Sequence, residues 1–176
     1  MANVTYGDKI FGLRDLKVTN IGGTTQEDLD AAQTLSFKFV FQGDNLMGDD
    51  ALKSTINFAT HGEAEVSAGS VSSGALGIML GVTPATTGST PNAVTEIQVN
   101  AGANMPYFKI YGKSLGEGTD DMHVLLSKVK VKDCSILELG NGQWRISKFT
   151  VICVDDATHG IVEIKMNETA ATLPTS

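Results

Sequence analysis

Histidine and cysteine are the residues in this chain whose chemistry most readily supports metal binding or nucleophilic catalysis. His61, His123 and His159 lie far apart in the sequence and form no His-x-His or His-Glu-x-x-His pair. Cys134 and Cys153 lack the Cys-x-x-Cys spacing of a structural zinc site. One disulfide is arithmetically possible, but nothing places the chain in an oxidising compartment, so we expect free, buried thiols. The spacing thus predicts no metal site, and histidines that are exposed or hydrogen-bonded.

Two glycine-containing segments resemble ligand-binding loops but depart from them in spacing. Gly43–Asp50 is acidic and glycine-rich, yet its carboxylates do not alternate as in a calcium loop and no glutamate closes it. Gly112-Lys113-Ser114 is similar to the end of a phosphate-binding loop, but the first glycine of that pattern is missing and no helix follows. We therefore expect a solvated turn at the first segment and the end of a strand at the second.

Charged side chains at alternate positions indicate wetted strand faces rather than catalytic pairs. Glu63 and Glu65 share a face of a predicted strand, without a partner base or any sign of a cleft. Lys128, Lys130 and Lys132 could form a basic stripe for DNA, but no aromatic residues are interleaved with them. These lysines are expected on a solvated or subunit-facing side of a strand. No catalytic or cofactor-binding set emerges, so the chain is not expected to be an enzyme.

The composition is that of one globular domain with few charges. The chain has 176 residues, of which 41% are hydrophobic and 19% charged, below the roughly 25% of an average soluble domain. The net charge of −7 argues against a reader of nucleic acid, which would neutralise phosphates with Lys and Arg. No apolar run is long enough for a membrane span, and the first residues lack the pattern of a secretory signal. We expect a soluble protein that is made in the cytoplasm and has no membrane partner.

Alternation of apolar and polar residues predicts a mainly β fold. The clearest strands are Leu35–Phe41 and Leu52–Phe58, which we expect to be joined by a long polar loop. Further strands are expected at Glu63–Ala68, Val94–Val99, Tyr107–Gly112, Met122–Lys132, Ile136–Leu139, Trp144–Val154 and Val162–Met166. Asn141 lies between two glycines and predicts a hairpin.

One helix, two terminal segments and a few connections complete the prediction. Ser70 or Ser72 can cap the start of the helix, and Gly81 stands where a left-handed C-terminal cap is expected. Residues 1–12 are predicted to form an arm, 26–32 a loop or one helical turn, 83–92 a loop, and 169–176 a tail. Residues 1–176 are thus expected to be a single domain, a two-sheet β-sandwich or barrel-like fold with one flanking helix.

The order of several motifs resembles one protein family, the tail-tube proteins of long-tailed bacteriophages. The segment Phe41–Lys53 is similar to that family's Leu-x-Gly-Asp-Asp loop between two strands. The segments that follow it in the family's order are His61–Gly69, Ala75–Gly81, Phe108–Gly112, Met122–Lys130 and Trp144–Phe149. The resemblance covers about residues 35–155, and the sequence departs from the family in its N-terminal arm and at 102–106.

The resemblance implies a structural role in the virion tail. Six copies would form a ring, and stacked rings a hollow tube that conducts double-stranded DNA during ejection. The implied partners are further copies of the chain, tail-tip or baseplate, tape-measure and tail-terminator proteins, and in some tails a sheath protein; assembly would take place in the host cytoplasm. Because DNA is a dense polyanion, an acidic lumen would let it slide. Glu63 and Glu65 are therefore predicted to face the lumen, and the contacts between rings are assigned to Asp44, Met47, Asp49 and Asp50.

Two other functions remain open at this point. The same tube could belong to a contractile injection or type VI-like secretion apparatus, which passes protein. A β-sandwich binding or adhesin module would instead need exposed aromatic platforms. The candidates for such platforms are Tyr6, Tyr107, Tyr111 and Trp144.

Overall fold

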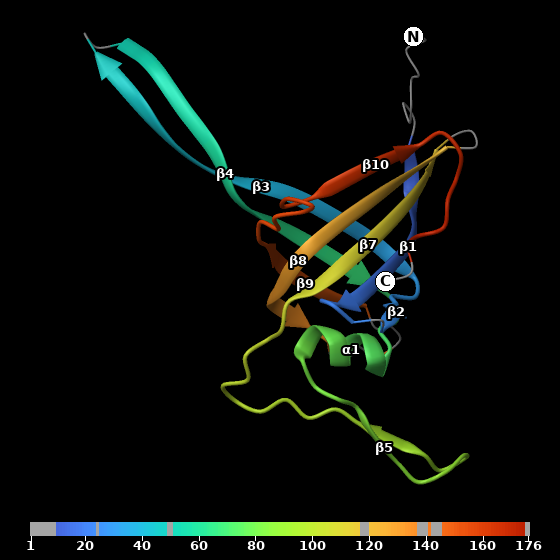
Figure 1. The fold of residues 1–176 in the computed structure, drawn as a ribbon. Coiled ribbons are helices and arrows are strands. Elements are labelled where there is room, and N and C mark those ends of the chain that lie inside the picture. The colour runs from blue at the N-terminus through green and yellow to red at the C-terminus, as the bar shows by residue number, and fades with distance from the viewer. Residues whose placement is uncertain are drawn as a thin grey trace.

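A computed structural model describes residues 10–23, 25–48, 51–116, 120–136, 141 and 146–174 of the chain. These residues contain ten strands and one helix (Figure 1). The elements are β1 (Ile10–Asn20), β2 (Gln26–Asp28), β3 (Ala32–Gly48), β4 (Ala51–Ala68), α1 (Ser73–Leu80), β5 (Ala85–Thr87), β6 (Val94–Glu96), β7 (Phe108–Gly116), β8 (Asp121–Ser135), β9 (Ser147–Cys153) and β10 (Glu163–Asn167). The mainly β class with a single helix is confirmed for the described part of the chain.

Nearly all the strands belong to one antiparallel sheet. Its order is β2-β1-β7-β8-β9-β4-β3, and β10 pairs with β8 beside this path. Only β5 and β6 form a separate two-stranded ladder. The sheet folds over itself, because a Cβ added to Gly112 on β7 would lie 2.8 Å from Cδ2 of Leu35 on β3. Among the described residues no ladder joins β3 to β1 or β2, so the sheet is folded over without closing into a hydrogen-bonded barrel.

The core lies between the two halves of the folded sheet and is closed at one end by α1. Strand alternation puts one side of each strand inward, as in β9, where every second residue from Ser147 to Cys153 is buried. The fully or almost fully buried apolar side chains include Leu16, Val18, Val66, Phe108, Ile110, Leu126, Val129, Phe149 and Val151. The inward face of α1 adds Ala75 and Met79 to this cluster.

The helix forms where the local signals predict it. The Ser72 hydroxyl accepts a hydrogen bond from the Ala75 N–H at 3.0 Å, which caps the N-terminus. Gly81 ends the helix with a φ of 70°, a left-handed conformation that glycine adopts without a Cβ penalty. The predicted helix with its left-handed cap at Gly81 is confirmed, and of the two candidate N-caps, Ser70 and Ser72, it is Ser72 that caps the helix.

The long polar loop expected between Phe41 and Leu52 is wrong. Strand β3 continues through Gly43 and Asp44 to Gly48, and β4 pairs with it from Ala51 onward. Cross-strand pairing overrides the turn propensity of Gly43, Asp44 and Gly48, because each of these three has a partner on β4, as Asp44 has in Ile56. The predicted break between Phe58 and Glu63 is also absent, since β4 is one strand of 18 residues.

Other boundaries shift in the same direction, toward more strand. Strand β1 begins at Ile10, inside the expected N-terminal arm, and β2 replaces the expected loop or helical turn at 26–32. Strand β5 lies within the predicted loop 83–92. The expected tail packs on the body through Leu173, which is buried. The predicted Asn-Gly hairpin, the strand at 136–139 and the start of the strand at 144 fall largely outside the described residues.

No helix in the described part of the chain is both long and apolar enough to cross a lipid bilayer.

Candidate functional site

The outer halves of β3 and β4 form a protruding hairpin, defined here as residues 41–48 and 51–59. Strand β9 pairs with β4 only from Gly62 to Ala68, so this ladder ends before the hairpin begins. In the described residues the outer half of β3 pairs with β4 alone. The two strands therefore leave the body together, as Figure 1 shows. Within the described part of the chain, both outer edges of the hairpin carry backbone N–H and C=O groups without a neighbouring strand.

The protruding hairpin exposes an unusual amount of apolar side chain. Six of its large apolar residues are between 52% and 65% exposed: Phe41, Leu46, Met47, Leu52, Ile56 and Phe58. An isolated two-stranded hairpin is marginally stable in water, and contiguous exposed apolar surface marks interaction sites. The hairpin is therefore a surface that another chain would be expected to cover.

The register divides these side chains between the two faces of the hairpin. Phe58 pairs with Gln42, Ile56 with Asp44, and Ser54 with Leu46, which places these pairs on one face. We call Leu46, Ile56 and Phe58 the apolar stripe. Phe41 lies on the other face, next to polar pairs such as Asn45 with Thr55. Of the predicted ring-to-ring residues, Asp44 and Met47 lie on this hairpin, and Asp49 and Asp50 are outside the described residues.

The body carries a contrasting polar face on the outward side of β3, β4, β9 and β8. Three cross-strand rows make up this polar face. They are Lys38-Glu63-Ile152-Lys130, Ser36-Glu65-Thr150-Asp133 and Thr34-Ser67-Lys148-Ser135. The alternate rows between them, such as Leu35-Val66-Phe149-Cys134, point into the core. The expectation that Glu63 and Glu65 share one face of a strand is confirmed.

Glu63 is held between two lysines and is not a free acid. Lys132 Nζ lies 2.6 Å from Glu63 Oε1, and Lys38 Nζ lies 2.9 Å from Glu63 Oε2. Hydrogen bonds from Lys132 and Lys38 lower the pKa of Glu63 to about 2, against a smaller opposing effect of burial. Lys132 is 69 residues from Glu63 in sequence, so strand pattern alone could not reveal this arrangement. Glu65 stays exposed beside it.

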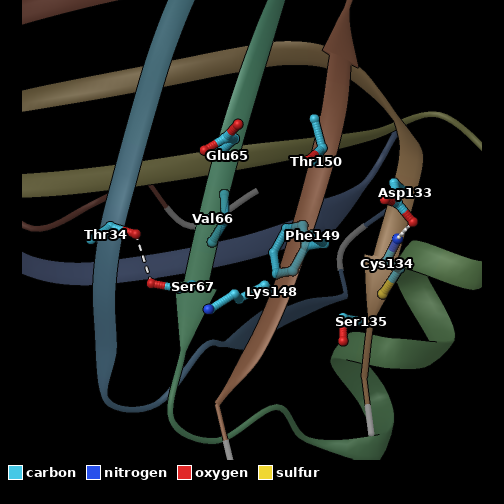
Figure 2. A pocket seen from close by; sticks show the side chains of 10 residues that line it. All are labelled: Thr34, Glu65, Val66, Ser67, Asp133, Cys134, Ser135, Lys148, Phe149 and Thr150. Atoms are coloured by element: carbon cyan, nitrogen blue, oxygen red, sulfur yellow. Dashed lines mark hydrogen bonds between the residues drawn. The ribbon is translucent and has the colours of Figure 1, made fainter. Parts of the chain in front are cut away.

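Part of the polar face is hollowed into an open depression of about 480 Å³ (Figure 2). Four of its ten lining residues carry hydroxyl groups: Thr34, Ser67, Ser135 and Thr150. Thr34 and Ser67 point toward one another, with Thr34 Oγ1 2.6 Å from Ser67 Oγ. Cys134, which contributes to the lining, has its pKa raised by desolvation, so the thiol stays protonated and unreactive. Both cysteines are free thiols, and they are not cross-strand partners, because Cys134 pairs with Phe149 and Cys153 with Val129.

Two lysines of β8 have an aromatic neighbour, Tyr107, that does not belong to β8. Lys128 and Lys130 lie with their Nζ atoms 5.3 and 5.5 Å from the centre of the Tyr107 ring. Tyr107 immediately precedes β7, the strand that pairs with β8. The aromatic residue that the sequence of β8 lacks is thus supplied by the residue just before β7, and only the pairing of β7 with β8 reveals it.

Buried Asp121 forms the densest polar cluster in the described residues. Its carboxylate accepts hydrogen bonds from Asn167 Nδ2 at 2.6 Å and from the Ala171 N–H at 2.8 Å. Lys113 Nζ and His123 Nε2 lie 3.1 and 3.0 Å away. Lys113 also donates to the Ala171 carbonyl oxygen. The cluster ties the C-terminal segment to β7, β8 and β10, and every group in it is already paired, so its role is structural.

The remaining histidines are also engaged. His159 Nδ1 lies 2.5 Å from Glu163 Oε2, and His61 Nδ1 lies 2.9 Å from Thr60 Oγ1. In the part of the chain that the structure describes, no three His, Cys, Asp or Glu side chains lie together so that they could hold a metal ion.

Acid should destabilise the fold below about pH 4. Burial raises the pKa of Asp121, but its hydrogen bonds outweigh this effect and lower the pKa to about 2, as they do for Glu63. The pKa of each carboxyl therefore lies below its ordinary value, which is 3.8 for Asp121 and 4.5 for Glu63. Their stabilisation is therefore complete above about pH 4.5 and is lost as the pH falls through about 2. Urea denaturation followed by circular dichroism should show a level free energy of unfolding from about pH 7 to 5 and a steep fall below 4; a flat profile down to about pH 2 would contradict this.

Comparison of the chain with models of known protein families found no match, and comparison with curated proteins found none.

Proposed function

We propose that this chain is the structural subunit of a hollow phage tail tube, in which stacked hexameric rings conduct double-stranded DNA into the host. The observation that carries the proposal is the protruding hairpin, with two open edges and six exposed apolar side chains. A chain that works alone gains nothing from such a surface, whereas a subunit that assembles covers it in every copy. The six-fold ring and the DNA cargo rest on the resemblance to tail-tube proteins.

In this proposal the hairpin reaches the neighbouring ring. Its tip carries Met47, and Asp44 lies in the same row as Ile56, so two of the four residues assigned to the ring-to-ring contact are available for it. The body of β3 is also an edge strand in the described sheet. Edge strands of neighbouring copies can join their sheets, because each supplies the backbone groups that the other lacks.

The polar face is proposed to line the channel, with Glu63 and Glu65 on the lumen side. Its charges do not make an acidic wall. Five lysines (38, 128, 130, 132 and 148) stand on this side of the sheet against three carboxylates, Glu63, Glu65 and Asp133, which leaves about +2. Two of the lysines are paired with Glu63. A hydroxyl-rich wall whose charges largely cancel would neither hold a passing duplex nor repel it strongly.

The proposed partners are other copies, the tail-tip or baseplate, tape-measure and terminator proteins, and a sheath where the tail contracts. The proposed location is the virion tail, after assembly in the host cytoplasm, with no enzymatic role, no cofactor and no membrane contact. Because the polar face is mixed in charge, a second candidate is the inner tube of a contractile injection or type VI-like apparatus, which passes protein. The cargo would distinguish the two.

Negative-stain electron microscopy of the purified full chain tests the proposal. We expect hollow rings or filaments, whose amount rises with protein concentration because assembly follows mass action. Sedimentation of the same samples should show a high-mass species. A species that stays strictly monomeric up to several hundred micromolar, roughly the range in which weak interfaces still form, would rule out a tube subunit and favour a monomeric binding module.

A further inference from the structure

At the end of the folded sheet opposite α1, the inner face is apolar and open to solvent. Beyond the closed core lies a hollow of about 210 Å³, whose lining includes Leu13, Leu35, Met122 and Val124. Strand β10 extends this surface, because Ile164 pairs with Val124 and Met166 with Met122, and cross-strand partners share a face. Ile164 is 55% exposed, Met166 51% and Phe39 on β3 44%. We call this hollow and its three exposed residues the open mouth.

The chain's own hairpin cannot fold back to cover the open mouth. Phe37, Phe39 and Phe41 form an aromatic row along β3, with ring centres 4.9 and 6.0 Å apart, which leads from the mouth into the hairpin. Since β3 stays extended to Gly48, the seven residue-to-residue steps from Phe39 to Leu46 span about 23 Å. Figure 1 shows the hairpin pointing away from the body and α1 at the other end.

We infer that the open mouth of one copy receives the apolar stripe (Leu46, Ile56 and Phe58) of the hairpin from a second copy. Both surfaces are apolar and both lack a partner in the described chain. They cannot meet within the same copy, because β3 stays extended from Phe39 at the mouth to Leu46 on the stripe. A heterologous contact between them satisfies both surfaces and repeats from copy to copy.

The inference rests on the proposed function, because it names the receiving surface for the hairpin of a neighbouring subunit. It also adds a direction. The hairpin and the mouth are different surfaces, so each copy acts as donor to one neighbour and acceptor for another, and the assembly has polarity.

Disulfide trapping between two differently tagged preparations tests the contact directly. One preparation carries Ile56→Cys and the other Met166→Cys, and after mixing and mild oxidation we expect a cross-linked pair that contains both tags. Val94→Cys on β6, 62% exposed, replaces Met166→Cys in the control and should give none. The wild-type chain should not cross-link either, because Cys153 is fully buried and Cys134 partly so. If the occupant of the mouth is a foreign protein or residues 1–9 of the same chain, the mixed pair will not form, and the inference is overturned.

An assembly measurement separates this inference from the proposed function. Met166→Glu should raise the protein concentration needed for half-assembly about tenfold or more, as for a residue central to an interface, while Val94→Glu should leave it unchanged. Circular dichroism confirms that both monomers are folded, since both positions are exposed. If the wild type assembles and Met166→Glu assembles equally well, the inference fails and the tube proposal stands. If the wild type does not assemble, the tube proposal fails, and the mixed-copy cross-link at high concentration alone supports or overturns the contact.

Discussion

Replacing Asp121 with alanine is expected to lower the free energy of unfolding by about 3 kcal/mol, the lower end of the cost of removing one partner from a buried ion pair. The Asp121 carboxylate is fully buried and accepts hydrogen bonds from two side chains and one backbone group besides its ion pair with Lys113. Without it, Lys113 keeps a largely buried charge, and the Ala171 N–H loses its acceptor. The segment that follows β10 should detach first, because Asp121 accepts hydrogen bonds from the Asn167 side chain and the Ala171 N–H.

Urea denaturation and hydrogen exchange together check this prediction. Asp121→Ala should unfold at a lower urea concentration, and the backbone amides at 167–174 should exchange faster than in the wild type. Asp28→Ala is the matched control: Asp28 also pairs with a lysine, Lys17 at 3.1 Å, but its side chain is 59% exposed, so its loss should cost only about 0.5 kcal/mol. Equal effects of the two substitutions would show that the buried cluster does not hold the fold together as argued.

Replacing the apolar stripe with serine should abolish assembly while the monomer stays folded. The variant Leu46→Ser, Ile56→Ser, Phe58→Ser removes three side chains that are each more than half exposed in the single chain. Their truncation should therefore change the free energy of unfolding little, within about 0.5 kcal/mol per site. In an assembly the same side chains would be buried, and each would contribute about 1–2 kcal/mol to association. The loss of all three contributions would raise the protein concentration needed for assembly above the micromolar range.

Sedimentation velocity and electron microscopy measure the assembly of this variant. The control carries Asn45→Ser and Asn57→Ser, two exposed residues on the opposite, polar face of the same hairpin. It should assemble like the wild type. A triple variant that still forms tubes at wild-type concentrations would mean that the stripe is not the contact surface, and a triple variant that unfolds as a monomer would mean that the stripe stabilises the single chain.

Local patterns were enough to predict the class of the fold and its helix. The alternation at Leu35–Phe41 indicates which side of the strand is buried, and the caps at Ser72 and Gly81 act within one helical turn. Both signals depend only on residues that are close together in the sequence. The same locality misled at Gly43–Asp50, where turn-forming residues suggest a loop. Pairing with residues 51–57 keeps at least Gly43–Gly48 extended, and that pairing is not a local property.

The candidate site depended on contacts between distant residues. The sequence by itself determined that the chain is mainly β, carries one capped helix and places Glu63 and Glu65 on one face of a strand. Only the tertiary structure decided that Lys132 reaches Glu63 across 69 positions, that Tyr107 lies beside the lysines of β8, and that Asp121 binds a segment 50 residues away. It also decided that the hairpin protrudes, because this depends on where the pairing of β9 with β4 ends. Alternation shows which residues share a side of a strand, but which strands are neighbours, and how far they remain paired, is set by the packing of the whole sheet.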